Sequence, residues 1–439
     1  MPTTSLPCSL ADLLKGLRPC FTAPTFRTFQ ALVGGFLAQP GLRTVTGMLV
    51  GARLAGRWHH ARAHRFFAAA RWSADQLGLL VCDLIVDLLL SPDAPIVLVV
   101  DDSLFKRTGR KIHGAGWRYD ATATGRTRTA WGNTWVVLGV LVALPLVAHR
   151  RVCLPVGARL WQPGGPSKLD LASVLVGLLA TRYPDRQFHL TGDAAYAGKT
   201  LRGLPKRVSV TTRLRSDAAL CALPGPRRPG QRGRPRVKGE RLPELIVLAA
   251  LVRVRWQQVI LWCYSTKHTK ELASLVCLWP TVFGAQPVRV VLVRPVGSPD
   301  GYELALVSTD LKATPAELVE RYAARWNVEV LFEEARQVSG VGQARNRVRN
   351  AVERTVPFGL ACVSLTVVWY ALHGQPTLDV ATRRALAPWY TAKHAPSFAD
   401  MHAALRRVII AAQYQPGRLV EPTPAEILQV QQAWTAAAA

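Results

Sequence analysis

Hydrophobic and polar positions divide the chain into a helical beginning, a strand-rich middle and a helical end. Up to about residue 92, apolar side chains recur at helical spacing, as in Phe26, Phe29 and Leu32. From about residue 93, short apolar runs alternate with a helix candidate from Leu169 to Thr181. This alternation of strands and helices predicts an α/β fold.

Two of the strand candidates end in aspartate. The continuous apolar run from Ile96 to Val100 is typical of a strand buried on both faces, and Asp101 and Asp102 follow it. A second short candidate, residues 187–191, is followed by Gly192 and Asp193. A single aspartate at such a place is more often a turn former or a helix cap. Two of them suggest a site, because α/β sheets carry their chemistry at the carboxyl ends of strands.

A long helix is predicted to begin after Thr314. Thr314 can cap it, Pro315 suits its first position and Glu317 completes a capping box. No proline or glycine follows before Ser339 and Gly340, which leaves room for about six turns.

One face of this helix is strongly polar. At about 100° per residue, Tyr322, Arg325, Glu329 and Arg336 lie within roughly 60° of one another. Apolar surface for packing comes from other positions, namely Trp326, Val330 and Leu331. The polar face is therefore expected to look across a cleft or into solvent. An ordinary solvated ion pair between Arg325 and Glu329, four residues apart, is the alternative interpretation.

Taken together, these motifs resemble those of the DDE transposases of bacterial insertion sequences. The late helix resembles the branch with a Tyr-Arg-Glu-Lys signature, although Arg336 stands where lysine is usual. By position, the resemblance implies a catalytic, metal-binding triad of Asp101, Asp193 and Glu329. Asp102 competes with Asp101, although the family pattern Asp-x-Ser/Thr favours Asp101 followed by Ser103.

The resemblance covers about residues 95 to 345 and implies a fold and a reaction. The fold would be an RNase H-like mixed sheet flanked by helices, interrupted by a β-rich insertion. Two Mg²⁺ ions, with Mn²⁺ as a substitute, would support hydrolysis at the element end and then strand transfer. The partners would be the element ends and target DNA, with the protein acting as a homodimer that brings two ends together.

Several residues are predicted to contact DNA. Because they share a helix face with Glu329, Tyr322, Arg325 and Arg336 are expected to contact phosphates near the scissile bond. A basic segment follows the first aspartate and includes Lys106 and Arg107. Aromatic residues are interleaved with its later cations, a pattern that suits phosphate contact together with base stacking. The same aromatic residues are equally compatible with packing inside the protein. The other members of this segment are Arg110, Lys111, Trp117, Arg118 and Tyr119.

A second basic segment contains Arg232 and Arg234. Its Arg-Gly-Arg-Pro core is typical of a hook that enters a narrow minor groove. A plain flexible basic loop fits the same residues.

The expected domain organisation follows from these patterns. A helical N-terminal domain for DNA binding or dimer support precedes an RNase H-like core in two parts, separated by a basic insertion in which residues 245–264 and 288–296 look strand-rich. A helical C-terminal region with a disordered tail follows. The predicted boundaries are residues 1–92, 93–213, 214–310, 311–375 and 376–439.

Composition favours a nucleic-acid partner. The 439 residues include 55 Lys and Arg against 28 Asp and Glu, a net charge of +27. Such an excess predicts DNA binding that weakens steeply with salt, although an arginine-rich composition can also reflect a GC-rich genome. The eight cysteines form no Cys-x-x-Cys pair, and Asp83 and Asp87 interrupt the apolar run near residue 80. We therefore expect a cytoplasmic, nucleoid-associated bacterial protein without a membrane anchor.

Two other functions share the same motifs. One is an RNase H-like nuclease or resolvase that cuts DNA without strand transfer. The other is a catalytically inactive DNA-binding derivative of a transposase.

Overall fold

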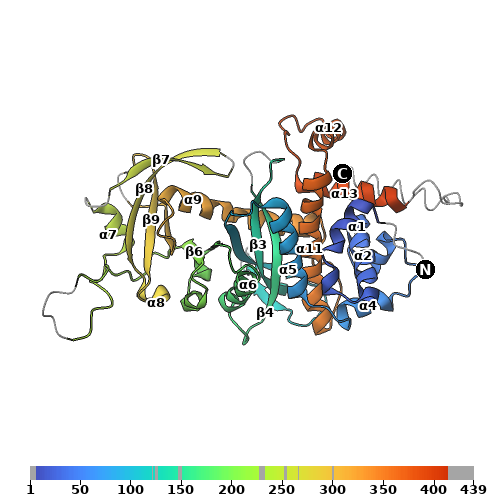
Figure 1. Cartoon of the computed structure of the whole chain (residues 1–439), viewed down its shortest axis with the longest axis horizontal. Helices are drawn as coiled ribbons and strands as arrows, with labels where there is room; N and C mark the ends of the chain where they lie inside the picture. Colours follow the sequence, from blue (N-terminus) through green and yellow to red (C-terminus); the bar gives the residue numbers. More distant parts are fainter. Residues whose placement is uncertain are drawn as a thin grey trace.

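A single mixed sheet extends from one end of the molecule, where β7, β8 and β9 lie, to its centre, where β3 and β4 lie (Figure 1). The computed structural model describes residues 6–120, 122–123, 127–146, 151–226, 233–251, 255–264, 266–298 and 301–413. Within them the sheet has ten strands in the order β2-β3-β1-β5-β6-β10-β9-β8-β7, and β4 also pairs with β3. Helices cover the sheet, so the molecule is a mixed α/β protein, as predicted.

The first part of the sheet is antiparallel and then parallel. β1 pairs antiparallel with β3, which also carries β2 and β4, while β5 pairs parallel with both β1 and β6. Helix α6 (Lys168–Arg182) connects β4 to β5. This arrangement is consistent with an RNase H-like fold. The strands are β1 (Ile96–Lys106), β2 (Gly116–Tyr119), β3 (Thr129–Ala143), β4 (Arg151–Trp161), β5 (Phe188–Gly192) and β6 (Val208–Arg213).

Four later strands extend the same sheet, because β10 pairs antiparallel with β6. They are β7 (Gln257–Cys263), β8 (Thr266–Leu278), β9 (Pro287–Pro295) and β10 (Leu304–Ser308). Two short helices, α7 (Leu245–Ala250) and α8 (Pro280–Phe283), lie among them. The prediction of strand from residue 245 was wrong for α7. Its buried residues Leu245, Leu248 and Ala249 follow the helical spacing of three and four.

The N-terminal helices pack around one long helix, α11 (Arg349–His373) (Figure 1). The ring of Phe358 on α11 meets Phe29 edge-on at 5.9 Å and Phe67 edge-on at 5.3 Å. The N-terminal helices and the sheet therefore share one core with α11. The helices are α1 (Cys8–Lys15), α2 (Ala23–Ala38), α3 (Val45–Gly51), α4 (Ala61–Ala68) and α5 (Ala74–Leu89), and near the other end α12 (Pro376–Leu386) and α13 (Phe398–Gln413).

Helix α11 is the one helix among the described residues that is long and apolar enough to cross a membrane. Its most apolar window has a mean hydropathy of 1.7, and 89% of that window is buried inside the protein. Its apolar surface is thus used in the core of the fold.

Strand β1 is longer than its apolar run predicted. The run ends at Val100, but β3 pairs with β1 from Leu98 to Lys106, whereas the parallel pairing with β5 ends at Val99. Asp101 and Asp102 therefore lie within β1, at the point where its ladder with β5 ends. The expectation that both follow the end of the strand was wrong, because pairing with β3 continues the strand through polar residues.

The late helix begins as predicted but is divided. The hydroxyl oxygen of Thr314 accepts from the backbone N–H of Glu317 at 3.2 Å, and the Glu317 carboxylate accepts from the N–H of Thr314 at 2.7 Å, a complete capping box. Helix α9 (Pro315–Ala323) then gives way to a 3₁₀ turn, η4 (Ala324–Trp326), before α10 (Asn327–Gln337). Trp326, which was expected to pack, lies in this turn and is 49% exposed.

The capping box gives a stability prediction. Replacing Thr314 by alanine removes the acceptor for the Glu317 N–H, so Thr314→Ala should lower the free energy of unfolding by about 1 kcal/mol. Thr314→Ser keeps the hydroxyl and should stay close to the wild-type protein. Urea denaturation followed by circular dichroism measures both, and equal losses in the two variants would contradict the role of the cap.

Candidate active site

Two of the predicted triad residues lie beside each other, Asp101 on β1 and Asp193 directly after the neighbouring strand β5. In the parallel register of β1 and β5, Val99 is opposite Thr191. Two residues further along each chain come Asp101 and Asp193, which therefore lie level and on the same side of the sheet. Asp193 directly follows β5, where its carboxylate accepts from the Ala195 N–H at 2.9 Å.

A single guanidinium connects the third predicted member to the first. Arg325 Nη1 lies 2.8 Å from Asp101 Oδ2, and its Nη2 lies 2.9 Å from Glu329 Oε1. The Arg325 side chain is 13% exposed and that of Glu329 36%. Arg325 and Glu329 thus form no ordinary solvated pair. The polar face was expected to look across a cleft or into solvent, and solvent was wrong for Arg325, because its guanidinium contacts Asp101 on the sheet.

Asp102 points to the other side of the sheet. Its Oδ2 accepts from Lys168 Nζ at 2.7 Å, and its Oδ1 accepts from the Tyr196 hydroxyl at 3.3 Å. Lys168 is 66 residues from Asp102 in the sequence, so its role could not be recognised before the sheet was known. Side-chain alternation along β1 therefore separates the two neighbouring aspartates, and Asp101 is the one that shares a side with Asp193.

The carboxyl group of Asp101 has an unusual environment. Burial raises its pKa to about 7, and Asp193 and Asp102 act in the same direction by charge repulsion. Arg325 and the backbone N–H of Asp102 oppose this rise without cancelling it. Strongly shifted carboxyl groups beside like charges are typical of functional sites.

The donor atoms suit a hard divalent cation in kind. Asp101, Asp193 and Glu329 supply carboxylate oxygens, and the repulsion between the first two is the sort that a bound cation relieves. Yet in the described ranges no three His, Cys, Asp or Glu side chains stand close enough together to hold an ion. Arg325 lies between Asp101 and Glu329 instead. A cation at these oxygens would compete with its guanidinium.

Some predicted DNA contacts have partners inside the protein. Arg107 donates to Asn133 Oδ1 at 3.0 Å and to the backbone oxygens of Gly342 and Ala344, and burial lowers its pKa to about 10. Arg336 donates to Ser103 Oγ at 2.8 Å. These two arginines fix the end of α10 and the segment after it onto β1 and β3.

The other predicted contacts differ in their surroundings. Tyr322 is partly buried, and its ring lies 5.7 Å from the Arg325 guanidinium carbon. Lys106 is exposed and pairs with Asp120 at 2.8 Å. Arg234 is exposed, while Arg232 lies outside the described residues.

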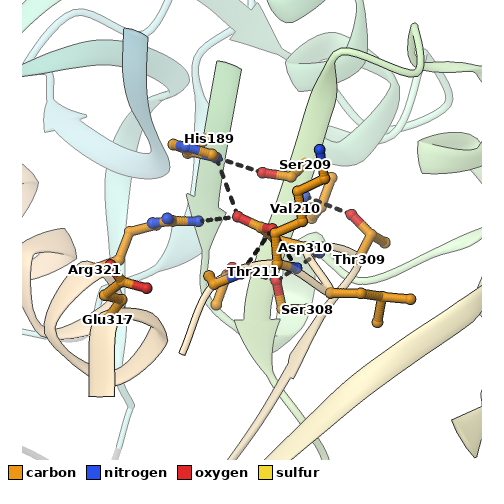
Figure 2. A network of polar contacts seen from close by, with 12 residues as sticks. His189, Ser209, Val210, Thr211, Ser308, Thr309, Asp310, Glu317 and Arg321 are labelled. Atoms are coloured by element: carbon orange, nitrogen blue, oxygen red, sulfur yellow. Dashed lines mark hydrogen bonds and ion pairs between the residues drawn. The ribbon is translucent and has the colours of Figure 1, made fainter. Parts of the chain in front are cut away.

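A polar network one helical turn before Arg325 was missed by the sequence analysis (Figure 2). Arg321 of α9 donates to Asp310 Oδ2 at 3.0 Å, and the other carboxylate oxygen accepts from the N–H groups of Lys312 and Ala313. His189 of β5 lies 3.7 Å from Asp310 and 2.6 Å from Ser209 Oγ. The network ties α9 to β5, β6 and the end of β10, and no local pattern joins residues so distant in sequence.

His189 is neutral in this network. Burial lowers its pKa to about 4, and the nearby positive charge of Arg321 acts in the same direction, while Asp310 opposes it. Arg321 already pairs with Asp310, so the carboxylate cannot fully compensate a second cation.

The His189 environment predicts a loss of stability in weak acid. As the pH falls below 6.5, the histidine of the unfolded chain takes up a proton before the folded one does. Stability is therefore fully present above pH 6.5 and falls as the pH approaches 4. Between pH 7 and 5 this residue should account for about 1 to 2 kcal/mol of the loss. His189→Asn keeps a hydrogen-bond donor near Ser209 but cannot take up a proton in this pH range. It should therefore remove the pH-dependent loss of stability that His189 causes. Parallel pH profiles of urea stability for the two proteins would contradict the assignment.

One comparison with known proteins identifies the family of this chain. Residues 16–269, more than half of the chain, match a family model described as DDE superfamily endonuclease. The matched region contains Asp101 and Asp193, and Glu329 lies beyond its end. No curated protein matches the chain. By the family match, this chain belongs to the DDE superfamily endonucleases.

Proposed function

We propose that this protein is a transposase that cuts DNA at the ends of its insertion sequence and joins the freed 3′ ends to target DNA. The observation that carries the proposal is the Arg325 guanidinium, which joins Asp101 to Glu329 beside Asp193 on one side of the sheet. Membership of the DDE endonuclease family supports nuclease chemistry with divalent metal ions. The Tyr-Arg-Glu-Lys branch is part of the proposal and rests on the spacing of Tyr322, Arg325, Glu329 and Arg336.

The three carboxylates have defined roles in this proposal. Asp101, Asp193 and Glu329 would hold Mg²⁺, and the chemistry that the bound ions would supply is activation of the attacking oxygen and stabilisation of the leaving oxygen of the phosphodiester. Asp102 is not assigned to this set, because Lys168 and Tyr196 occupy its oxygens on the opposite side of the sheet.

Arg325 and Arg336 act on the position of these groups. Arg325 holds the Asp101 and Glu329 carboxylates near each other and offsets their charge, and a cation that binds the same oxygens would have to take the place of its guanidinium. Arg336 fixes α10 against β1 through Ser103, two residues beyond Asp101. Tyr322 stands about two helical turns before Glu329, on the same face, where its hydroxyl can meet a phosphate. We also propose that the partner is DNA, which the net charge of +27 favours. A homodimer that brings two element ends together belongs to the same proposal.

An RNase H-like nuclease without strand transfer is the second candidate, since the family match supports nuclease chemistry as such. Joined products separate the two. Cut ends that never become linked to target DNA would favour the nuclease, and binding without cutting would favour an inactive derivative.

The proposed triad is tested by neutral, isosteric replacements. Asp193→Asn and Glu329→Gln should each lower end cleavage by about 100-fold or more, because each removes a cation ligand whose stabilisation amounts to several kcal/mol. The substrate is DNA carrying the sequences that flank the gene, with Mg²⁺ or Mn²⁺, and products are mapped at nucleotide resolution. Asp102→Asn is the matched control and should lose far less. If Asp102→Asn were as inactive as the triad variants, the choice of Asp101 over Asp102 would be overturned.

The bridging geometry of Arg325 gives a separate prediction. Arg325→Ala should lower cleavage by about tenfold or more, since Asp101 and Glu329 would lose their common partner. Arg325→Lys should restore only part of this, because one ammonium cannot reproduce two parallel contacts of a planar guanidinium. Full activity of either variant in the same nicking assay would show that the bridge is dispensable.

A further inference from the structure

Two large aromatic side chains on β2 face solvent. Trp117 is 68% exposed and Tyr119 is 65% exposed, and their spacing of two places both on one side of the strand. Trp117 meets Trp131 of β3 edge-on at 6.0 Å, and the Trp131 indole donates to the Gly109 carbonyl at 3.0 Å. We call Trp117, Tyr119 and Trp131 the aromatic ledge. Trp131 packs against Trp117, and the rings of Trp117 and Tyr119 are exposed to solvent.

The aromatic ledge lies on the same side of the sheet as Asp101. Trp117 is opposite Trp131 in the pairing of β2 with β3, and Asp101 is opposite Val137 in the pairing of β1 with β3. Opposed residues of antiparallel strands share a side, and Trp131 and Val137 are an even number of residues apart on β3. At about 3.4 Å per residue, the separation along the strand is roughly 20 Å. This equals about six nucleotide steps of a B-form strand.

The surface around the aromatic ledge is cationic. Arg110, Lys111, Arg128 and Arg347 are exposed, and the His113 N–H donates to the Arg347 carbonyl, which brings that segment to the loop before β2. None of these four cations has a carboxylate partner in the part of the chain that the structure describes. The nearby acids are already paired, Asp120 with Lys106 and Glu353 with Arg349.

The other side of the same strands is different. Arg118, which alternates with Trp117 and Tyr119, lies over the ring of Trp161 at 5.5 Å, and Lys168 lies over the same ring at 5.4 Å. These two cations are used within the protein. The open aromatic rings of Trp117 and Tyr119 therefore lie on the side of Asp101, and the exposed cations lie in the segments that adjoin β2.

We propose that the aromatic ledge binds unpaired bases of the DNA whose scissile phosphate lies at Asp101. This inference rests on the proposed function. In a duplex, the faces of the bases are stacked on one another, so open aromatic rings can stack only on bases that have left the helix or lie at its frayed end. The four cations around the rings match the phosphates of that strand. A second copy of this chain is a poorer match, because a symmetric contact would set these cations against their own copies, and like charges across an interface repel.

The test uses the full-length protein with Trp117→Ala and Tyr119→Ala combined. Fluorescence anisotropy in EDTA measures the dissociation constants of a labelled single strand and of the duplex of the same sequence, so that binding is measured without cleavage. The double variant should bind the single strand about tenfold or more weakly, while its affinity for the duplex stays at the wild-type value. The slope of affinity against salt should not change, because every cation is kept. A second double variant, Trp117→Phe with Tyr119→Phe, keeps an aromatic ring at both positions and should restore single-strand binding.

A charge control separates stacking from attraction to phosphates. Lys111→Ala combined with Arg128→Ala should reduce the salt slope for single-stranded DNA by about 0.7 for each phosphate that the protein no longer neutralises. Thermal unfolding shows whether each variant is folded, and the exposed positions should leave it unchanged.

Three outcomes would overturn the aromatic ledge as a site for unpaired bases. They are equal losses for single-stranded and duplex DNA, no loss for either, and a shift from dimer to monomer in sedimentation. The last would assign the surface to a second copy of the chain. If the wild-type protein bound no DNA at all, the proposed function would fail as well, whereas unchanged binding by the variant would reject the aromatic ledge alone.

Discussion

The structure depends on one buried charge contact between helix and sheet, the Arg325 guanidinium on Asp101 and Glu329. Asp101 and Arg325 are 224 residues apart in the chain, so this contact fixes the late helix onto the first strand. Taking these charges out of water is costly unless each is paired. A helix shifted by one residue would leave Asp101 buried beside Asp193 without a cation. The same contact that brings the carboxylates together thus also selects the register of the helix.

Two more arginines of this helical segment repeat the pattern. Arg321 contacts Asp310 and Arg336 contacts Ser103, so three points along α9 and α10 are held on polar atoms of the sheet. Arginine acts in the same way elsewhere. Arg354 donates to the carbonyls of Phe67, Ala70 and Trp72, and Arg202 to those of residues 280–282. Part of the arginine excess that suggested a nucleic-acid partner is therefore internal, and the charge that can meet DNA is smaller than the net charge.

Local signals predicted what depends on local physics. The capping box of Thr314 and Glu317 is a contact within one turn, and the apolar run before Asp101 identified the correct strand. The missed features depend on distant partners. Pairing with β3 prolongs β1 through Asp101 and Asp102. Once they lie in a strand, their side chains alternate and point to opposite sides of the sheet. The network of His189, Asp310 and Arg321 joins β5, the end of β10 and α9, and no spacing in the sequence announces it.

This network gives the late strands a role in the position of Glu329. β10 pairs with β6, and Asp310 follows it within two residues before the chain turns into α9. Arg321 then ties that helix back to Asp310, four residues before Arg325 reaches Asp101. The helical segment is consequently held at two places on the sheet. Arg321 holds it to the residues after β10, and Arg325 holds it to β1. A displacement of β10 relative to β1 would have to break one of these buried ion pairs, which cost several kcal/mol when one partner is left alone. Strands β5, β6 and β10 and the helical segment that carries Glu329 are therefore linked around the carboxylates by strand pairing and buried ion pairs.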